Sequence, residues 1–406
     1  MGGGPAGLYS ALLLKRADPR HEVTVYEREP QGAVRGWGVT FWDDLLAAMR
    51  GHDAESAAAV AQAATGWTGL ETYVEGQPAV SNPEFWGHSI ARATLIQILE
   101  ERAREVGVEL SFDTEVVVDD LSEQADLVIC ADGVNSRFRR QHADQLGTSV
   151  DIGRNRFAWL ATPRPFPAFR FAFTTSRAGW LCCYAYAYGA DASTFVVELP
   201  PETFDALDLA VLSPAETTAL LAETFAWQLD GQPLLVQPDA DGTMPWRQFP
   251  TIRNRSWQLG NVALLGDAAH TAHYSIGFGT KLALEDAMAL AAAVGDVAAE
   301  SDVPAALRRY QESRQREVAR TQRDADFSRR WFEHADRYLG LPVDDFSSLL
   351  DRRRSPLVAY LPPALLVGAR RLVKRTGLAR RLRSLRGGLA RTQSAWRCLV
   401  SRSCRE

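Results

Sequence analysis

A glycine-rich turn at the start of the chain restricts the fold more than any other feature. Residues 2–7 read Gly-Gly-Gly-Pro-Ala-Gly, which fits the pattern Gly-x-Gly-x-x-Gly. In that pattern the first glycine allows a tight turn, the second lets a phosphate approach the backbone, and the third lets a helix pack on a sheet. Glu27 closes a strand-like run about 20 residues later, where a carboxylate can accept hydrogen bonds from a ribose. The spacing predicts a turn that presents a helix N-terminus to the diphosphate of a dinucleotide.

Two further turns follow apolar runs that are typical of buried strands. One follows residues 127–130 and the other follows residues 262–265. Their glycines and acidic residues, with two glycines further on, are Asp132, Gly133, Gly266, Asp267, Gly277 and Gly279. Taken singly, each turn is most often an ordinary Asp-Gly turn at a strand end. Together and in this order, they indicate one site in which carboxylates bind a polyol and helix amides face an electron-rich ring.

The periodicity of apolar residues predicts an α/β unit that is interrupted and then resumed. Helices are predicted at 8–18, 53–64, 92–106, 213–228, 279–297 and 303–335. Strands are predicted at 23–26, 108–112, 115–118, 127–130 and 262–265, with several more antiparallel strands within 156–199. Alternate positions of one such strand share a face and are occupied by Trp180, Cys182, Tyr184, Tyr186 and Tyr188.

We therefore expect an α/β fold: a dinucleotide-binding parallel sheet interrupted by an antiparallel-sheet substrate domain, with a helical C-terminal tail. The predicted segments are 1–75, 91–150 and 255–340 for the dinucleotide-binding part, 76–90 and 151–254 for the substrate sheet, and 341–406 for the basic tail. Only Met1 stands before Gly2, where a dinucleotide fold has a buried central strand. We expect either a natural start upstream or a lost core strand, and we expect a native upstream apolar segment to raise cofactor occupancy.

Composition sets broad limits on the class of protein. The chain has 406 residues, 46% of them hydrophobic and 23% charged, which indicates a globular protein of more than one domain. No apolar run approaches the roughly 18 residues of a membrane-spanning helix, and the first residues lack a signal-peptide pattern. The five cysteines are not spaced as a disulfide framework or a metal site. We expect a cytoplasmic protein without a metal or a nucleic-acid partner.

The C-terminal tail is strongly basic, although the whole chain carries a formal net charge of −5. Residues 364–406 hold twelve Arg and Lys residues and one acid, Glu406. Leucines recur among the arginines at helical spacing, which is typical of an amphipathic helix. The sequence leaves three interpretations open: a weak contact with an anionic membrane, binding of an anionic carrier or a CoA diphosphate, and packing on the acidic body of the protein.

The three turn motifs also carry a resemblance to a known family. Over about residues 1–340, the chain resembles the class A flavoprotein monooxygenases, the para-hydroxybenzoate hydroxylase superfamily. The resemblance is closest to the branch of salicylyl-CoA 5-hydroxylase and the violacein-pathway tryptophan hydroxylase. The stretches that carry this closer resemblance are 36–39 (GWGV), 151–156 (DIGRNR), 270–277 (HTAHYSIG) and 328–333 (SRRWFE).

The resemblance implies one FAD, NADPH or NADH as the reductant, molecular oxygen, and an electron-rich aromatic or indolic substrate, of which a CoA thioester is one form. Enzymes of this family hydroxylate through a flavin hydroperoxide, from which the protein excludes water. The resemblance assigns Glu27 to the adenosine ribose, and Arg92 and Asp267 to the flavin chain. The complete predicted cofactor-binding set is Gly2, Gly4, Pro5, Ala6, Gly7, Glu27, Arg28, Gly38, Val39, Arg92, Asp132, Gly133, Gly266, Asp267, Gly277 and Gly279.

The chain departs from the family pattern where the family places residues near the substrate. His273 and Tyr274 stand where the family usually has two prolines, and Lys281 stands where it usually has asparagine. We predict that His273 and Tyr274 are catalytic and lie near the reacting ring, where a base would help to loosen a phenol or indole proton. The alternative for His273 is a structural hydrogen bond in a turn, and His270 is predicted to be a structural cap.

Aromatic residues of the inserted sheet are the candidate substrate contacts. We select Trp159, Tyr184 and Tyr186, and the alternative is that this face forms the core of the sheet. Two functions besides hydroxylation remain open: an FAD-dependent reductase or dehydrogenase of a polyketide or prenyl substrate, and a flavin-binding protein without catalysis. A flavin halogenase is disfavoured because the chain lacks the pattern Trp-x-Trp-x-Ile-Pro.

Overall fold

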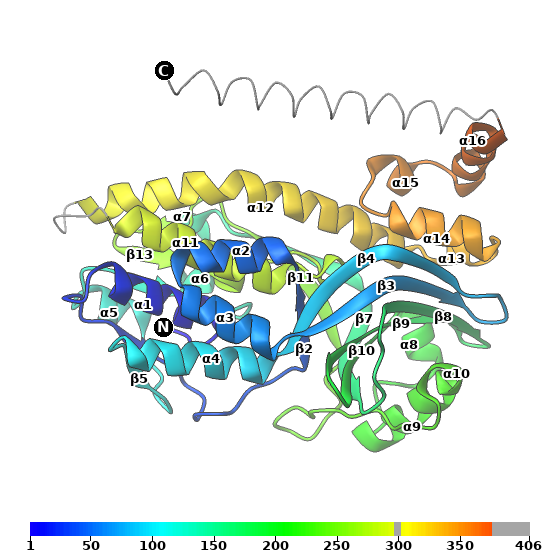
Figure 1. The fold of residues 1–406 in the computed structure, drawn as a ribbon, viewed down its shortest axis with the longest axis horizontal. Coiled ribbons are helices and arrows are strands. Elements are labelled where there is room, and N and C mark those ends of the chain that lie inside the picture. The colour runs from blue at the N-terminus through cyan, green and yellow to red at the C-terminus, as the bar shows by residue number, and fades with distance from the viewer. Residues whose placement is uncertain (296–301, 376–406) are drawn as a thin grey trace.

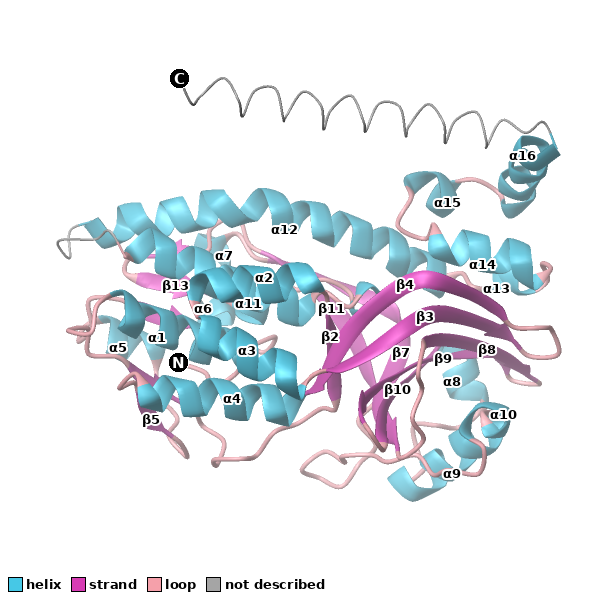
Figure 2. Cartoon of the chain, viewed as in Figure 1, coloured by secondary structure: helices cyan, strands magenta, loops and turns pink. Residues whose placement is uncertain are grey.

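A computed structural model describes residues 1–295 and 302–375 and shows two layered regions spanned by one long helix (Figure 1). The strands are β1 (Thr24–Tyr26), β2 (Gly38–Phe41), β3 (Thr65–Val74), β4 (Val80–Ala91), β5 (Glu109–Ser111), β6 (Val128–Cys130), β7 (Ser149–Thr162), β8 (Phe169–Ser176), β9 (Gly179–Gly189), β10 (Ala192–Leu199), β11 (Arg247–Arg253), β12 (Gln258–Leu259) and β13 (Val262–Leu264). Figure 2 shows the longer strands gathered in one curved sheet and most helices gathered around the short strands.

The helices are interspersed among the strands up to β11, and the helices from α11 on follow the last strand. The α-helices are α1 (Pro5–Ala17), α2 (Asp43–His52), α3 (Ala54–Ala63), α4 (Arg92–Glu105), α5 (Val118–Ser122), α6 (Arg137–Gln141), α7 (Ala143–Leu146), α8 (Pro201–Ala206), α9 (Pro214–Thr224), α10 (Ala226–Leu229), α11 (Gly279–Val294), α12 (Val303–Glu333), α13 (Asp336–Leu339), α14 (Val343–Asp351), α15 (Pro356–Tyr360) and α16 (Pro363–Arg375). Two short 3-10 helices, η1 (Gly266–Ala268) and η2 (Tyr274–Ile276), lie between β13 and α11.

The first region is the α/β part and contains short parallel strands. β1 pairs with β5 in parallel, and β6 pairs with β13 in parallel, with β12 at the edge. Met1 and Gly2 lie between these two small sheets. The Met1 nitrogen donates to Ile129 O at 2.7 Å, and the Gly2 nitrogen donates to Tyr26 O at 2.8 Å. The predicted α/β class is confirmed, and the strand expected before Gly2 stays a prediction.

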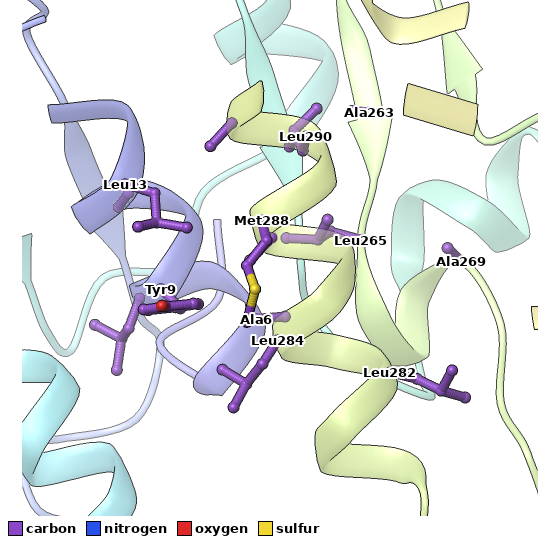
Figure 3. Packing of buried hydrophobic residues seen from close by; sticks show 14 of the residues in the cluster. Ala6, Tyr9, Leu13, Ala263, Leu265, Ala269, Leu282, Leu284, Met288 and Leu290 are labelled. Atoms are coloured by element: carbon purple, nitrogen blue, oxygen red, sulfur yellow. The ribbon is translucent and has the colours of Figure 1, made fainter. Parts of the chain in front are cut away.

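Helix α1 is buried along most of its length because the strands and two other helices surround it. Its residues 6–14 are all buried. In Figure 3, Tyr9 and Leu13 of α1 lie beside Leu284 and Met288 of α11. Apolar burial of this kind stabilises a fold by roughly 25 cal/mol per Å² of buried surface. The packing therefore fixes the position of the glycine turn that precedes α1.

The second region is an eight-stranded sheet with the order β11-β7-β10-β9-β8-β3-β4-β2. Neighbouring strands are antiparallel except β3 and β8, which are parallel. Helices α12 to α14 cover one face, and helices α8 to α10 cover the other. The predicted alternation is confirmed, since the first core contains Trp180, Cys182 and Tyr184 and the second contains Leu181, Cys183 and Ala185.

This large sheet takes in more of the chain than the predicted segments 76–90 and 151–254. β2 and β3 lie within the predicted segment 1–75, and both pair with β4 in the large sheet. The strand β3 follows the alanine-rich helix α3 directly and contains two glycines, so its periodicity is weak in the sequence. The wider division of the chain into segments stays a prediction.

Two local predictions are corrected by the structure. No strand forms at 115–118, where the prediction was wrong, and α5 begins at Val118 instead. Asp119 and Asp120 lie in the first turn of α5, where carboxylates stabilise a helix N-terminus. Helix α2 was not predicted, and it too begins with two acidic residues.

The C-terminal region is helical over its described part. Helices α13 to α15 follow α12 over the large sheet, and α16 ends at Arg375 (Figure 1). The rest of the predicted basic tail lies outside the described residues. Within 1–295 and 302–375, no helix is long and apolar enough to cross a membrane.

A group of ion pairs joins α12 to the large sheet. Arg329 contacts Asp151 of β7 at 2.7 Å and Glu333 at 2.8 Å. Glu333 also accepts a hydrogen bond from the Arg154 backbone nitrogen at 2.7 Å. Two stretches that are distant in the sequence thus form one joint.

Replacing Arg329 with methionine tests this joint. The change leaves the buried Glu333 carboxylate without its cation, and we expect the free energy of unfolding in urea to fall by about 3 kcal/mol. Arg330→Met is the matched control, because Arg330 is exposed and should change stability by less than about 0.5 kcal/mol. Equal stability of the two variants would contradict the conclusion that the Arg329 ion pairs stabilise the contact between α12 and the large sheet.

Candidate active site

The glycine turn is packed so closely that side chains do not fit in it. Gly2 has a φ of +104°, and a Cβ there would lie 2.3 Å from Ala131 O at the end of β6. A Cβ at Gly7 would lie 2.0 Å from Gly2 O. The turn therefore brings the first motif against the second. Helix α1 begins at Pro5 with no side-chain cap, which leaves its first amides available to an anion.

Glu27 and the turn form one side of a cleft. The Glu27 carboxylate accepts hydrogen bonds from the backbone nitrogens of Gly3 at 2.6 Å and Glu29 at 2.9 Å. The cleft is lined by Gly3, Gly4, Glu27, Arg28, Arg35, Arg92 and neighbouring residues. Arg28 is exposed and pairs with Glu29. At the cleft, a Cβ on Gly4 would have open space around it.

Arg92 and Asp267 come together from different parts of the chain. Arg92 is the first residue of α4, and its Nε is buried without a hydrogen-bond partner among the described residues. Burial lowers the pKa of Arg92, and the nearby Asp267 carboxylate opposes that shift. Asp267 follows β13 and is exposed. The cleft thus has an unpaired donor on Arg92 and an open helix N-terminus, and the Asp267 carboxylate lies near Arg92. These groups fit the diphosphate and sugar parts of FAD.

The second motif forms a turn beside this cleft. Asp132 accepts hydrogen bonds from the Arg137 nitrogen at 3.0 Å and from Cys130 Sγ at 3.0 Å. Gly133 has a φ of +78°, which favours glycine. Both oxygens of Asp132 thus have partners within the protein, and its cofactor contact stays a prediction.

The loop after Asp267 runs from the cleft to the large sheet. His270 contacts Asp286 at 2.7 Å, and Asp286 also pairs with Arg314 at 2.8 Å. This buried group supports the structural interpretation of His270. Further along, Gly277 has a φ of +73°, and a Cβ there would lie 2.7 Å from Thr40 Oγ1.

His273 is buried and serves the turn in which it lies. Its Nδ1 is 2.9 Å from Ser275 Oγ and accepts from the Ser275 nitrogen at 3.4 Å. Burial, with a smaller contribution from Arg329, lowers the pKa of His273 to about 3. The imidazole is therefore neutral at pH 7 and a weak proton acceptor. Its predicted catalytic role stays untested, and the structure supports the alternative of a structural hydrogen bond.

Tyr274 is half-buried and points its hydroxyl at a carboxylate that sequence reasoning missed. The hydroxyl donates to Glu198 Oε2 at 2.8 Å. Tyr184 OH donates to the same oxygen at 2.5 Å, and Asn155 Nδ2 donates to Oε1 at 2.8 Å. Glu198 is 1% exposed. A single acid in the otherwise apolar end of β10, at an inward-facing position, was the signal that could have revealed it.

The three predicted substrate residues lie on one face of the sheet. Trp159 and Tyr184 each pair with Val196 from opposite sides. Trp159 is half-buried, and its Nε1 has no hydrogen-bond partner among the described residues. Tyr186 is buried and donates to Gly38 O at 2.8 Å. The Trp159 Nε1 donor is thus buried and unpaired among the described residues, whereas both tyrosine hydroxyls have protein partners.

Gly38 and Val39, predicted to bind the cofactor, lie where the two regions meet. Gly38 N donates to Thr194 Oγ1 at 3.0 Å, and a Cβ at Gly38 would lie 2.5 Å from the Tyr188 ring. Glycine is therefore required there by the large sheet itself. Val39 packs against the core of the α/β region. Their contact with a cofactor stays a prediction.

Comparison with known proteins gives a family match and several similar enzymes. A family model described as an FAD binding domain matches residues 212–325. The chain is 38% identical over 350 residues to a salicyloyl-CoA 5-hydroxylase of Streptomyces sp, in an alignment that covers 84% of this chain and 66% of that enzyme. It is 35% identical over 331 residues to the 3-hydroxy-4-methyl-anthranilyl-[aryl-carrier protein] 5-monooxygenase of Streptosporangium sibiricum, with 82% and 87% covered.

A third relative and a solved structure extend the comparison. The chain is 30% identical over 382 residues to the protodeoxyviolaceinate monooxygenase of Chromobacterium violaceum, with 92% of this chain and 99% of that enzyme covered. The fold matches the tetrameric form of 2-methyl-3-hydroxypyridine-5-carboxylic acid oxygenase with a TM-score of 0.66 at 20% identity, covering 89% and 95% of the two chains. The three relatives are named as hydroxylases or monooxygenases, so the reductase alternative finds no support among them.

Alanine at Gly7 and at Gly4 should separate packing from cofactor contact. Gly7→Ala forces a Cβ against Gly2 O, and we expect a loss of about 2 kcal/mol in apoprotein stability together with weaker FAD binding. Gly4→Ala should keep stability within about 0.5 kcal/mol and weaken FAD binding only. Urea unfolding and titration of the apoprotein with FAD measure the two effects. A destabilised Gly4→Ala or an unaffected Gly7→Ala would contradict this account.

The lowered pKa of His273 predicts a specific acid sensitivity. The folded state keeps this imidazole neutral down to about pH 3, while the unfolded chain takes up a proton below its ordinary value of 6.5. Unfolding therefore becomes easier as the pH falls, by about 2 kcal/mol between pH 7 and pH 5. His273→Asn, which can still cap the turn, should remove this share of the pH dependence.

The control for that measurement is His52→Asn, on the exposed end of α2. It should keep the pH dependence of the parent chain in urea unfolding at pH 7 and pH 5. If His273→Asn and the parent chain lose the same stability on acidification, then the claim that the folded state keeps the His273 imidazole neutral is wrong.

Proposed function

The chain belongs to the FAD-dependent monooxygenases of aromatic compounds, and on this premise we propose that its substrate is an electron-rich aromatic ring carried as a thioester. The enzyme uses FAD, a nicotinamide reductant (NADPH or NADH) and molecular oxygen. Two relatives support the thioester by their names, since one acts on a CoA ester and the other on an aryl group held by a carrier protein. Hydroxylation of such a ring is the function that the geometry supports best.

The observation that carries this proposal is the path of one loop. It begins at Asp267, near the Arg92 side chain that lines the dinucleotide cleft, passes Tyr274 and enters α11 at Gly279. Within this short stretch the chain moves from the cleft to the aromatic face of the large sheet. A flavin held at the cleft would therefore have the aromatic face within reach of the same loop, as oxygen transfer to a ring requires.

The residues proposed to hold FAD are the turn before α1, Glu27, Arg92 and Asp267. The free amides of α1 would bind the diphosphate, and Glu27 would bind a ribose. Gly277 and Gly279 would bring backbone amides to the ring system. When bound and reduced, FAD supplies the chemistry that activates molecular oxygen, and the protein supplies position and a dry site.

The aromatic side chains would orient the substrate ring and exclude water. Phe157 lies 4.4 Å from Tyr274 between ring centroids, and Phe249 lies 5.7 Å from it. Phe157, Tyr274 and Trp159 are half-buried, so they are partly accessible while they pack against the sheet core. We propose Trp159 as a direct substrate contact, and Tyr184 and Tyr186 as the wall behind it.

A free indolic compound is the second candidate substrate. It is favoured by the relative whose alignment covers almost the whole of both chains, which is named for protodeoxyviolaceinate. We further propose a cytoplasmic location. For the basic tail we keep contact with an anionic membrane as a proposal, and its described part exposes Leu365.

Flavin reduction under anaerobic conditions tests the proposed substrate class. NADPH and NADH would each be mixed with the FAD-loaded enzyme and free hydroxybenzoic and aminobenzoic acids, their CoA thioesters, their carrier-protein thioesters, and indoles. We expect thioesters to accelerate flavin bleaching by at least about tenfold over the free acids, because a correctly held ring positions the reactants. In air, one atom of labelled oxygen should enter the product.

The panel also separates the candidates. Faster bleaching with indoles than with thioesters would replace the first candidate by the second. Rapid bleaching without any labelled oxygen in an organic product would contradict hydroxylation of this panel.

A further inference from the structure

A buried carboxylate ties the loop after Asp267 to the large sheet. Glu198 of β10 receives three hydrogen bonds, from Tyr274 of η2, Tyr184 of β9 and Asn155 of β7. Both tyrosine hydroxyls donate to Oε2, and the asparagine amide donates to Oε1. Within the described part of the chain, Glu198 has no ion-pair partner among the salt bridges formed.

The three hydrogen-bond donors indicate that Glu198 is ionised and that the two tyrosine hydroxyls keep their protons. A carboxylate surrounded by donors accepts through both oxygens, which favours its ionised form. Burial raises the pKa of Glu198, and the Glu333 carboxylate on α12 acts in the same direction, while the three donors oppose the shift. Burial and the Glu198 charge raise the pKa of Tyr274 and of Tyr184 well above 10, so both hydroxyls keep their protons.

Two further titratable groups, a thiol and a guanidinium, lie near this cluster. Cys182 on the same strand as Tyr184 is buried, and burial raises its pKa, so it stays neutral. Arg353, which follows α14, lies over the Phe171 ring at 5.0 Å and acts electrostatically on Tyr184. Burial lowers the pKa of Arg353 to about 10, which leaves it charged at neutral pH.

Only one of the two tyrosines can meet a ligand. Tyr184 is 3% exposed and Glu198 is 1% exposed, whereas Tyr274 is half-buried. The Tyr274 hydroxyl uses its one proton on Glu198, so its lone pairs remain free to accept a hydrogen bond. A ligand on the aromatic face that donates to Tyr274 would therefore be connected to the Glu198 carboxylate by two successive hydrogen bonds.

We propose that Tyr274 and Glu198 form a proton path from the substrate ring into the protein, an inference that rests on the proposed function. Tyr274 is the catalytic residue that contacts a hydroxyl or amino group on the ring, and Glu198 is the positioning residue behind it. The substrate O–H or N–H bond breaks as a new Tyr274 O–H bond forms. The former Tyr274 proton passes to Glu198 Oε2, and no electrons leave the ring.

The proposed proton path implies a class of substrate and a role in catalysis. Loss of the proton raises the electron density of the ring, which assists attack by an electrophilic oxygen, and base assistance of this kind contributes about 10²–10⁴-fold to rate. The substrate must therefore carry an ionisable hydroxyl or amino group conjugated with the ring. After oxygen transfer the ring carbon loses a proton as aromaticity returns, and the proton on Glu198 can go back to the product oxygen.

The test uses 2-hydroxybenzoyl-CoA and its 2-methoxy counterpart, which has no proton to give, on the FAD-loaded full chain. The variants are Glu198→Gln and Tyr274→Phe, with Tyr338→Phe as the matched control, because Tyr338 is a buried tyrosine of the same core whose hydroxyl donates to Val358 O and not to Glu198. Thermal melting checks that each variant folds. Ultraviolet difference spectra give the pKa of the bound phenol without turnover.

We expect the parent chain and Tyr338→Phe to lower the pKa of the bound phenol relative to the free ester. Glu198→Gln and Tyr274→Phe should raise it by about one pH unit or more over the parent value. Their kcat for the hydroxy ester should fall about 10²-fold with KM within about threefold, and the acid limb of the kcat profile should disappear. Binding of the methoxy ester should be the same for all four proteins.

Three results would overturn the path. The first is a pH profile and phenol pKa that Glu198→Gln and Tyr274→Phe leave unchanged, which makes the cluster a structural tie. The second is an equal effect of Tyr338→Phe, which would mean that the loss of any buried tyrosine hydroxyl in this core gives the same result. The third is a parent chain that binds the hydroxy ester no better than the methoxy ester. Hydroxylation of the hydroxy ester by the parent chain, measured separately, tells whether the proposed function also fails.

Discussion

The approach of Gly7 to Gly2 and of Gly2 to Ala131 is the contact on which the rest of the site depends. No side chain fits at either glycine, since added Cβ atoms would lie 2.0 Å and 2.3 Å from carbonyl oxygens. This closeness puts the first amides of α1 at the end of β6. Because β13 runs parallel to β6, its own end lies at the same edge, and Asp267 emerges there. One steric constraint thus assembles three motifs that are far apart in the sequence.

The α/β region, which contains the dinucleotide cleft, and the large sheet are held together by elements that both regions share. β2 belongs to the large sheet through its pairing with β4, yet Val39 of β2 packs in the core of the α/β region. Gly38 beside it contacts Thr194 and Tyr186 of the sheet. On the other side, α12 is held to β7 by Arg329. The two regions therefore share strands, core and ion pairs, and a ligand between them meets a fixed geometry.

What the sequence predicts well is local in the chain. The glycine turn, the runs before Asp132 and Asp267 and the alternation in β9 depend on spacing within a few residues, and the structure has these elements. The run 115–118 was misjudged because two acids after it favour a helix start over a strand. Gly38 was predicted for the cofactor, and its tight contact is with Tyr188. Such contacts depend on strand order, which spacing does not encode.

Glu198 is the clearest case of this limit, because its three partners come from β7, β9 and η2. Its position is also hard to explain by stability alone. A buried charge loses its hydration, and three hydrogen bonds without an ion-pair partner in the described part of the chain recover that loss only in part. An apolar residue at this inward position of β10 would fill the core beside Val196 without that cost. Tyr274 need not donate a proton to hold its ring between Phe157 and Phe249, since ring packing does that already. A carboxylate that stability does not require, hydrogen-bonded to the hydroxyl of the half-buried Tyr274, is better explained by proton transfer than by packing.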